Sequence, residues 1–342
     1  MPPLRNNRRT SIAVFGAGTW ATTIAHLLAS KGYDVTVWGK DRRALAALRS
    51  TGENKKYLPG VKLSRKIHTN SSITETAREA NLLVFGIPTQ YLRAVVQKIA
   101  RRIQPGSVLV NLAKGIENNT FLRGSELIRQ ETRARFPCAV LSGPNIAQEI
   151  IHRIPSKSVI SSSDVRYIPW LQDVFTTKYF KVFSNPDMVG VELSGALKNV
   201  IAILAGISDG LGYGDNTKSG IITRGLAEMM EFGIHHGANP NTFFGLAGLG
   251  DLVVTCSSPY SRNRTFGEMI AKGKSPAEAL RMLHGKVPEG YETSRAVYQL
   301  SQRIGISMPL TKQVYKILHT RHKSVREEFR QIWDTKGGSE LI

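Results

Sequence analysis

The first half of the chain alternates short apolar runs with longer segments of helical periodicity. The apolar runs are rich in β-branched residues and bounded by Gly, Pro or Asn. They predict buried strands at 11–15, 35–38, 82–85, 108–111 and 139–142. The segments between them predict helices at 20–30, 42–49, 90–100 and 124–133. Strands that are apolar on both faces and alternate with helices are typical of a parallel sheet covered on both sides.

The pattern changes after about residue 185, where strand signals fade and helical periodicity with glycine punctuation takes over. We expect helices at 187–204, 217–236, 262–271, 292–304 and 310–321. A length of 342 residues also favours two domains of roughly 150 residues each. The sequence therefore predicts an α/β fold: a doubly wound, Rossmann-type sheet in residues 1–187, followed by an all-helical domain in residues 188–342.

A glycine-rich motif, GAGTWA at 16–21, follows the first predicted strand and opens a helix. Gly16 permits a tight turn, Gly18 lets the backbone approach a pyrophosphate, and the small Ala21 lets the helix pack on the strand. The helix N-terminus then faces the negative charge of the phosphates. Because a strand precedes the motif and a second strand follows its helix, we interpret it as a dinucleotide-binding site.

The residues after the second predicted strand bear on the choice of cofactor. An acidic residue at this strand end would bind the ribose of NAD, whereas cations accommodate the additional phosphate of NADP. Here the strand runs into Gly39, Lys40, Asp41 and two arginines, with no acid at its tip. We expect the cofactor to be NAD(P)H, with NADP usable; alternatively the cations are solvated and Asp41 caps the next helix.

Four further segments are polar or glycine-rich, although a helix or loop with a purely structural role would need neither polar residues nor glycine there. They are 111–115, 142–147, 195–199 and 248–251, the last running on to 261–264. Lys114 and Gly143 each follow a predicted parallel strand, at the sheet edge where ligands bind in open α/β folds.

Lys198 is the strongest candidate for chemistry, since it lies in an otherwise apolar helix. Burial would lower its pKa and suit it to exchange a proton near neutral pH. Alternatively, its head group reaches water. Asp251 could pair with Lys198, or could cap a turn or helix. Arg262 and Asn263 open a helix and could bind a phosphate, or could face solvent.

Taken together, these segments resemble the NAD(P)-dependent sn-glycerol-3-phosphate dehydrogenases of the bacterial biosynthetic type, over nearly the whole chain. The resemblance rests on GAGTWA, VTVWGK, NLAKG, SGPNIAQEI, GALKNVIAILAGISDG, ITRGL, FGLAGLGDLVVTC, SRNR and VPEGYET. It implies reversible NAD(P)H-dependent reduction of dihydroxyacetone phosphate to sn-glycerol 3-phosphate, which supplies phospholipid synthesis.

The resemblance also implies residue roles. Lys198 would be the general acid and base, with Lys114 and Asp251 beside it in the catalytic set. Substrate contacts would come from Lys114, Gly143, Asn145, Lys198, Asp251, Ser261, Arg262 and Asn263. Cofactor contacts would come from Gly16, Gly18, Thr19, Trp20, Lys40, Tyr57, Lys114, Ala147, Arg262, Val287 and Glu289. Asn145 departs from the Ser or Thr that is common in the family, although it can still form hydrogen bonds.

The charge of the chain suggests a different function, because a net charge of +20 is typical of a nucleic-acid-binding protein. No recognition-helix motif and no interleaving of basic and aromatic residues accompanies it, so we expect no nucleic-acid partner. The excess is also uneven: residues 1–187 hold 28 cations and 12 acids, or +16, and the remainder holds 18 and 14, or +4. The half that should bind a dinucleotide therefore carries most of the charge, which can steer anionic ligands.

A second enzyme class, the β-hydroxyacid dehydrogenases, joins the same two kinds of domain. Its catalytic segment resembles Lys-x-x-Asn, but here Asn199 follows Lys198 directly and position 202 is Ala. An activity screen with dihydroxyacetone phosphate and 3-hydroxy acids would separate the two.

The composition indicates in which cellular compartment the protein works and which bound groups it lacks. Two cysteines cannot form a disulfide framework or a cysteine-rich zinc site, so we expect no metal. No uninterrupted apolar run approaches the ~20 residues of a membrane span, and no apolar signal core follows the basic N-terminal arm. We expect a cytoplasmic enzyme acting on a phosphorylated small molecule, and the family resemblance implies a homodimer.

Overall fold

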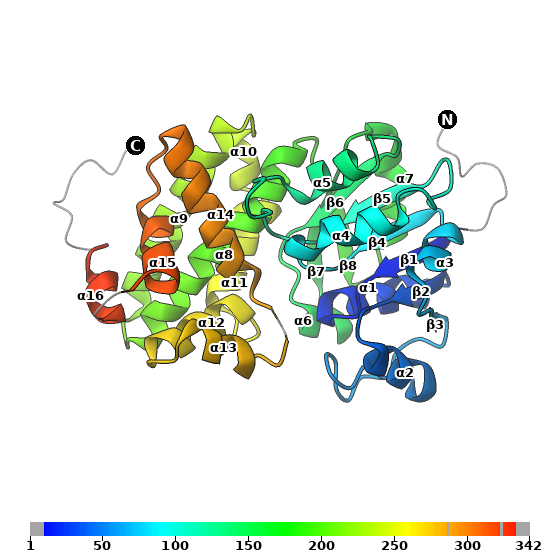
Figure 1. The fold of residues 1–342 in the computed structure, drawn as a ribbon, viewed down its shortest axis with the longest axis horizontal. Helices are drawn as coiled ribbons and strands as arrows, with labels where there is room; N and C mark the ends of the chain where they lie inside the picture. The colour runs from blue at the N-terminus through cyan, green and yellow to red at the C-terminus, as the bar shows by residue number, and fades with distance from the viewer. Residues whose placement is uncertain (1–9, 286, 322–323, 333–342) are drawn as a thin grey trace.

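The computed structural model describes residues 10–285, 287–321 and 324–332. The basic arm at 1–9 lies outside the described residues. Figure 1 shows a sheet domain built by the first half of the chain and a helical domain built by the second, side by side. The predicted α/β class, with a Rossmann-type sheet followed by helices, is confirmed.

The sheet has eight strands in the order β3-β2-β1-β4-β5-β6-β7-β8. All neighbouring strands are parallel except β6 and β7. Their bounds are β1 (Ser11–Phe15), β2 (Asp34–Trp38), β3 (Ile67–Thr69), β4 (Leu82–Phe85), β5 (Val108–Asn111), β6 (Cys138–Ser142), β7 (Ser156–Ser162) and β8 (Phe180–Ser184). The chain order changes direction between β1 and β4, which is where a doubly wound sheet opens a crevice for ligands.

The sequence analysis located β1, β2, β4, β5 and β6 but missed the other three strands. The sheet is parallel as expected except at β7, which runs antiparallel to β6. β7 escaped because its sequence, SKSVISS, is mostly polar, although five of its seven residues are buried. Ser158 Oγ, for example, donates to the Ser142 carbonyl of the neighbouring strand at 2.7 Å. Hydrophobicity alone does not mark such a strand.

Helices cover both faces of the sheet, as Figure 1 shows. α1 (Thr19–Ser30) and α7 (Ile168–Phe175) pack on one face, against alternate residues such as Ile12 and Val14. α3 (Ile73–Arg78), α4 (Thr89–Ile99) and α5 (Gly124–Glu131) pack on the other. α2 (Arg42–Thr51), α6 (Ala147–Ile151) and the 3₁₀ turn Val165–Tyr167 complete the domain.

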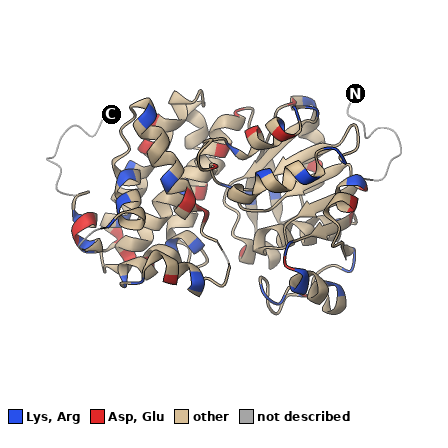
Figure 2. Ribbon diagram, viewed as in Figure 1, with Lys and Arg blue, Asp and Glu red and all other residues tan. Residues whose placement is uncertain are grey.

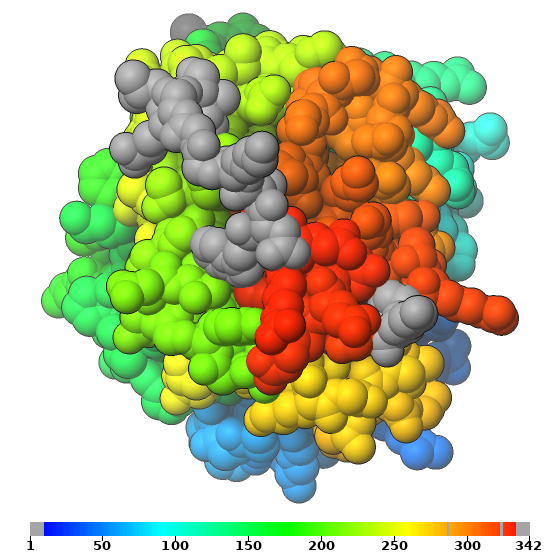
Figure 3. Space-filling view, turned by 90° about the vertical axis from the view of Figure 1, so that its left-hand side faces the viewer, coloured from blue at the N-terminus to red at the C-terminus, as the bar shows by residue number. Residues whose placement is uncertain are grey.

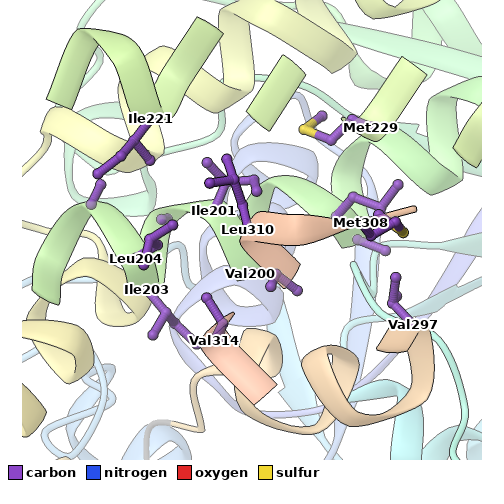
Figure 4. Close-up of a cluster of buried hydrophobic side chains, with 14 of the residues drawn as sticks. Val200, Ile201, Ile203, Leu204, Ile221, Met229, Val297, Met308, Leu310 and Val314 are labelled. Carbon is purple, nitrogen blue, oxygen red and sulfur yellow. The ribbon is translucent and has the colours of Figure 1, made fainter. Parts of the chain in front are cut away.

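The helical domain is built around α8 (Met188–Gly210), which is buried along nearly its whole length. Its aliphatic side chains meet those of the surrounding helices in one core, drawn in Figure 4. The other elements are α9 (Asp215–His235), α10 (Pro240–Phe243), a π-helical turn (Leu246–Gly250), α11 (Asp251–Ser257), α12 (Arg262–Ala271), α13 (Pro276–Met282), α14 (Glu289–Ile304), α15 (Pro309–His319) and α16 (Val325–Arg330). Figure 3 shows the outer end of this domain, where α16, in red, lies beside α9, in green.

Two details of this domain differ from expectation. The glycine-rich segment at 248–251 was expected to place Asp251 beside turns, but residues 246–257 form a continuous π-helical turn and helix. α8, in turn, is long and apolar enough to cross a bilayer, with a mean hydropathy of 1.5 in its best window. Because 89% of that window is buried inside the protein, α8 serves as a core helix.

α8 and α12 cross in contact at a pair of glycines. A Cβ on Gly206 would overlap the carbonyl of Arg264, and a Cβ on Gly267 would overlap the carbonyl of Ile203. Backbone therefore meets backbone, which fixes the separation of the two helices. This crossing sets the distance between Lys198 on α8 and Arg262 on α12.

We predict that Gly267→Ala lowers the free energy of unfolding by about 1–3 kcal/mol, because the methyl group overpacks the crossing and outweighs the higher helix propensity of Ala. Urea denaturation measures the change. Gly214→Ala is the matched control: its φ is −86° and a Cβ there would meet nothing within 4 Å. The control should change the unfolding free energy by less than about 1 kcal/mol, and equal losses in both variants would contradict the prediction.

Candidate active site

A cavity of about 250 Å³ opens where the carboxyl end of the sheet faces α8, α11 and α12. Twelve of the residues expected to bind substrate or cofactor line it: Thr19, Trp20, Tyr57, Lys114, Asn145, Ala147, Lys198, Asp251, Ser261, Arg262, Asn263 and Glu289. They come from segments up to 270 residues apart in the chain. The fold therefore gathers most of the predicted site at one place.

Two lysines share one buried carboxylate at the base of this cavity. Lys198 Nζ lies 2.9 Å from Asp251 Oδ1, and Lys114 Nζ lies 2.7 Å from Asp251 Oδ2. Lys114 Nζ also donates to the carbonyl of Gly143 at 2.8 Å. Asp251 begins α11 and is 1% exposed, so both of its oxygens are committed to the lysines rather than to water. The expected pairing of Asp251 with Lys198 is present in the structure.

Lys198 is held by a second acceptor on the same helix as Asp251. Its Nζ donates to Thr255 Oγ1 at 2.7 Å, and Thr255 Oγ1 donates to the Asp251 carbonyl. An ammonium has three hydrogens, so one remains for a ligand in the cavity. Burial lowers the pKa of Lys198 to about 8, with the Asp251 carboxylate opposing the fall and Lys114 adding to it. The side chain does not reach bulk water, so the alternative of a solvated head group is excluded.

A chain of amide groups joins the sheet edge to three helices. Asn199 Nδ2 donates to the Lys114 carbonyl at 3.0 Å, and Asn199 Oδ1 accepts from Asn263 Nδ2 at 2.9 Å. Asn263 Oδ1 then accepts from the backbone N–H of Gly290 at 3.0 Å. One hydrogen of the Asn263 side-chain amide and its Oδ1 are thus used within the protein, which leaves the second Nδ2 hydrogen and the backbone N–H, in the first turn of α12, to meet a ligand.

Glu289 adds a second tie between the domains. Its Oε1 accepts from the backbone N–H of Thr89 at 3.1 Å, and its Oε2 accepts from that of Lys114 at 3.1 Å. These two N–H groups follow β4 and β5, and Glu289 opens α14. One carboxylate therefore fixes the loops after two neighbouring strands against the helical domain.

The glycine motif has the geometry expected of a phosphate-binding turn. Gly16 has a φ of +121°, and a Cβ there would overlap the carbonyl of Gly86. Ala21 packs on Gly86 so closely that a Cβ on that glycine would lie 2.6 Å from the Ala21 Cβ. A Cβ on Gly18, in contrast, would meet nothing within 4 Å, and no side chain caps α1. The space beside Gly18 and the free helix N-terminus suit a pyrophosphate.

Unpartnered polar groups in the cavity lining indicate that its ligands form hydrogen bonds. Both polar atoms of the Asn145 side chain are buried without a partner, as is Nε1 of Trp20. Buried groups of this kind are costly unless something pairs with them. Together with the cradle at Gly18, they fit a polar dinucleotide and a phosphorylated substrate.

The remaining expected residues lie around the cavity rather than in its lining. Gly16 and Gly18 form the turn above α1, Gly143 accepts from Lys114, and Lys40 is exposed at the end of β2. Val287 lines a neighbouring cavity, which shares Glu289 with the first. Ser261 caps α12 by accepting from the backbone N–H of Arg264 at 3.3 Å.

Sequence reasoning missed six lining residues: Leu112, Ile146, Gln148, Asn199, Thr255 and Tyr260. A signal existed for two of them. Asn199 neighbours Lys198, and Thr255 lies four residues after Asp251, which is one helical turn and places both side chains on one face.

We predict opposite effects for the two glycines of the turn. Gly18→Ala should leave the free energy of unfolding within about 1 kcal/mol of the native value, yet weaken dinucleotide binding by about tenfold or more, because its methyl group enters the phosphate space. Gly16→Ala should destabilise the fold itself, through the positive φ and the overlap with Gly86. Thermal unfolding and a fluorescence titration with NADPH separate the two effects; a destabilised Gly18→Ala would contradict the assignment.

Comparisons with known proteins identify the family of the chain. A family described as NAD-dependent glycerol-3-phosphate dehydrogenase N-terminus matches residues 11–168, and the corresponding C-terminus family matches residues 187–329. Among curated proteins, the glycerol-3-phosphate dehydrogenase [NAD(P)+] of Geobacter sulfurreducens is 44% identical over 312 residues, 90% of this chain and 92% of its own. The enzyme of the same name from Bacillus licheniformis is 42% identical over 317 residues, 92% and 91% of the two chains.

Solved structures extend the agreement to three dimensions. The crystal structure of glycerol-3-phosphate dehydrogenase from Coxiella burnetii superposes with a TM-score of 0.91 at 32% identity, covering 96% of this chain and 99% of that one. A ketopantoate reductase family member from Ralstonia eutropha, at 14% identity and a TM-score of 0.60, shares the fold alone. The resemblance inferred from the motifs is thereby confirmed, and the chain belongs to the family of NAD-dependent glycerol-3-phosphate dehydrogenases.

Proposed function

We propose that this enzyme reduces dihydroxyacetone phosphate to sn-glycerol 3-phosphate with NAD(P)H, reversibly, and that Lys198 is its general acid and base. The observation that carries the proposal is the buried pair of lysines on one carboxylate, both of which line the cavity. Membership of the family supports the substrate and the reaction.

The cofactor would be held by the Gly16–Gly18 turn and by residues on both sides of the cavity. Thr19, Trp20, Tyr57, Ala147 and Glu289 are the lining residues that we assign to it, with Lys40 and Val287 nearby and Lys114 and Arg262 facing both ligands. When bound, the reduced nicotinamide supplies a hydride to C2 of the substrate.

Lys198 handles the proton of the reaction. As the carbonyl oxygen gains negative charge, the Lys198 ammonium hydrogen-bonds it and donates a proton, and Lys114 adds positive potential in a site shielded from water. Asp251 fixes both side chains so that neither must reorient as charge develops. In the oxidation direction, neutral Lys198 accepts the proton of the C2 hydroxyl.

The phosphate of the substrate would bind at the start of α12. The Arg262 guanidinium and the backbone N–H of Asn263 supply charge and hydrogen bonds there, with Ser261 shaping the turn. The unpartnered amide of Asn145 provides a further contact. Binding energy from the phosphate then orients the carbonyl toward Lys198.

Residues after β2 support use of NADP. Asp41 Oδ1 accepts from the backbone N–H groups of Arg43 and Ala44, both at 3.1 Å, and its Oδ2 pairs with Lys56 at 2.8 Å. Asp41, the acid that follows the strand tip in sequence, is therefore the cap of α2 and is not free to bind the ribose. Lys40, Arg42 and Arg43 remain exposed beside it for an additional phosphate.

We place this activity in the cytoplasm, in phospholipid precursor supply, and in a homodimer, with residues 1–187 as the cofactor domain and 188–342 as the substrate domain. Two cysteines that are both buried and unpaired suit a reducing compartment. The dimer and the pathway rest on the family resemblance.

We predict that Lys198→Ala lowers kcat for dihydroxyacetone phosphate reduction by about 10²–10⁴-fold while NADPH binding is retained. The measurement is NADH and NADPH oxidation with saturating substrate, alongside a binding titration. Lys218→Ala is the matched control, because Lys218 also pairs with a half-buried aspartate, Asp209, but does not line the cavity. Near-normal kcat in Lys198→Ala, or activity on 3-hydroxy acids alone, would overturn the assignment.

We predict opposite pH dependences for the two directions. Reduction needs the Lys198 ammonium, so its kcat should fall above pH of about 8; oxidation needs the neutral amine, so its kcat should rise up to about that pH. Asp251→Asn removes the carboxylate that raises the pKa of Lys198, so both limbs should move to lower pH. Initial rates from pH 6 to 10 in both directions test this, and limbs that stay in place in Asp251→Asn would contradict it.

A further inference from the structure

The chain between α2 and β3 forms a closed loop at residues 52–63. Of its residues, only Tyr57 and Lys56 have been given a role above. The two ends of the loop are joined by a hydrogen bond from the backbone N–H of Leu63 to the carbonyl of Gly52, at 2.9 Å. Leu58 anchors it in a small apolar cluster with Leu48 and Ile151. The loop is therefore a packed unit with its own anchor.

Asn54 projects from this loop under the glycine turn. Its side chain is fully buried, and both hydrogens of its amide are used. Nδ2 donates to the carbonyl of Ala17 at 2.8 Å and to Thr22 Oγ1 at 2.9 Å. Oδ1 has no partner in the described part of the chain. Burying a carboxamide with one unpaired oxygen costs stability, so packing alone does not account for this residue.

The bond to Ala17 determines the direction of the next N–H. A trans peptide is planar, so the Ala17 carbonyl and the Gly18 N–H lie in one plane and point in opposite directions. With the carbonyl held toward Asn54, the Gly18 N–H points away from the loop, and it has no acceptor among the described residues. The space beside Gly18 is open. Without this bond, the glycines on either side of Ala17 would leave the peptide free to rotate.

The same loop contacts the glycine turn and the turn after β2 at further points. Thr19 Oγ1 donates to the carbonyl of Tyr57 at 3.2 Å, and Lys56 pairs with Asp41. Figure 2 shows basic residues on α2 and on the chain that follows it. One loop thus contacts two turns: the glycine turn, which we expect to bind the pyrophosphate, and the turn after β2, which we expect to lie beside the ribose.

We propose that Asn54 is a positioning residue for the dinucleotide: it holds the Ala17–Gly18 peptide with its N–H toward the pyrophosphate before the cofactor binds. The inference rests on cofactor binding in the proposed function. Preorganisation of this kind raises affinity by removing an ordering cost from the binding step. Asn54 takes no part in proton or hydride transfer, so its substitution should change the affinity for the cofactor and not kcat.

The test measures the Kd for NADPH by fluorescence titration, together with steady-state constants, for the full-length enzyme and four variants. Asn54→Ala should raise the Kd and the KM for NADPH by about five- to tenfold, leaving kcat at saturating NADPH and the KM for dihydroxyacetone phosphate within about twofold. Asn54→Asp, which keeps the shape but cannot donate, should raise the Kd at least as much, and it serves if Asn54→Ala does not fold.

Two controls separate positioning from general destabilisation. Thr22→Val removes the other partner of the Asn54 amide but keeps the bond to Ala17, and its Kd should stay within about twofold of the native value. Leu58→Ala weakens the anchor of the same loop without touching the glycine turn, and should lower Tm more than it raises the Kd. A native-like Kd in Asn54→Ala, or an equal rise in Leu58→Ala, overturns the inference. If the unmodified enzyme binds neither NADH nor NADPH, the proposed function fails first.

Discussion

The site depends on one buried carboxylate that two lysines share. Removing an ammonium from water is costly, and two ammonium groups close together also repel each other. Asp251 offsets both effects, because each of its oxygens faces one lysine, at 2.9 and 2.7 Å. Lys114 belongs to the sheet edge, while Lys198 and Asp251 belong to α8 and α11. The ion pair on which the proposed mechanism rests is therefore also a contact between the two domains, and it can form only when both have folded and met.

The other ties between the domains have the same character: polar groups, each with a defined partner. Glu289 accepts from two backbone N–H groups of the sheet edge, and the amides of Asn199 and Asn263 connect that edge to the start of α14. Hydrogen bonds are directional, so these ties fix the position of Lys114 relative to α8 more precisely than apolar contact would. The glycine crossing of α8 and α12 provides the matching constraint within the helical domain, where the α8 backbone meets the α12 backbone directly. The cavity is held on all sides before any ligand arrives.

Hydrophobic periodicity and short motifs were enough to predict the elements and residues whose roles depend on their neighbours in sequence. Five strands, most helices, the glycine turn, and the pairing of Lys198 with Asp251 could all be predicted. β7 could not, because most of its residues are polar yet buried, and the partner of a side chain such as Ser158 is a carbonyl that only the folded sheet provides. Asn199, Thr255 and the structural use of the Asn263 side chain were missed for a related reason. An amide or hydroxyl has no recognisable chemistry in isolation, and its function comes from the partner that tertiary structure brings to it.

The balance of charge in the cavity follows from the reaction it has to serve. With no carboxylate, the pKa of Lys198 would be lower still, because burial and Lys114 both lower it and Asp251 is the group that raises it. With a second carboxylate, Lys198 would bind its proton too tightly to exchange it near neutral pH, and the site would repel a phosphorylated substrate. Two lysines and one carboxylate leave a net positive charge and a Lys198 pKa of about 8. Such a net charge favours anionic ligands, and a moderate pKa is what the proposed mechanism requires of Lys198, which has to give a proton in one direction and take it back in the other.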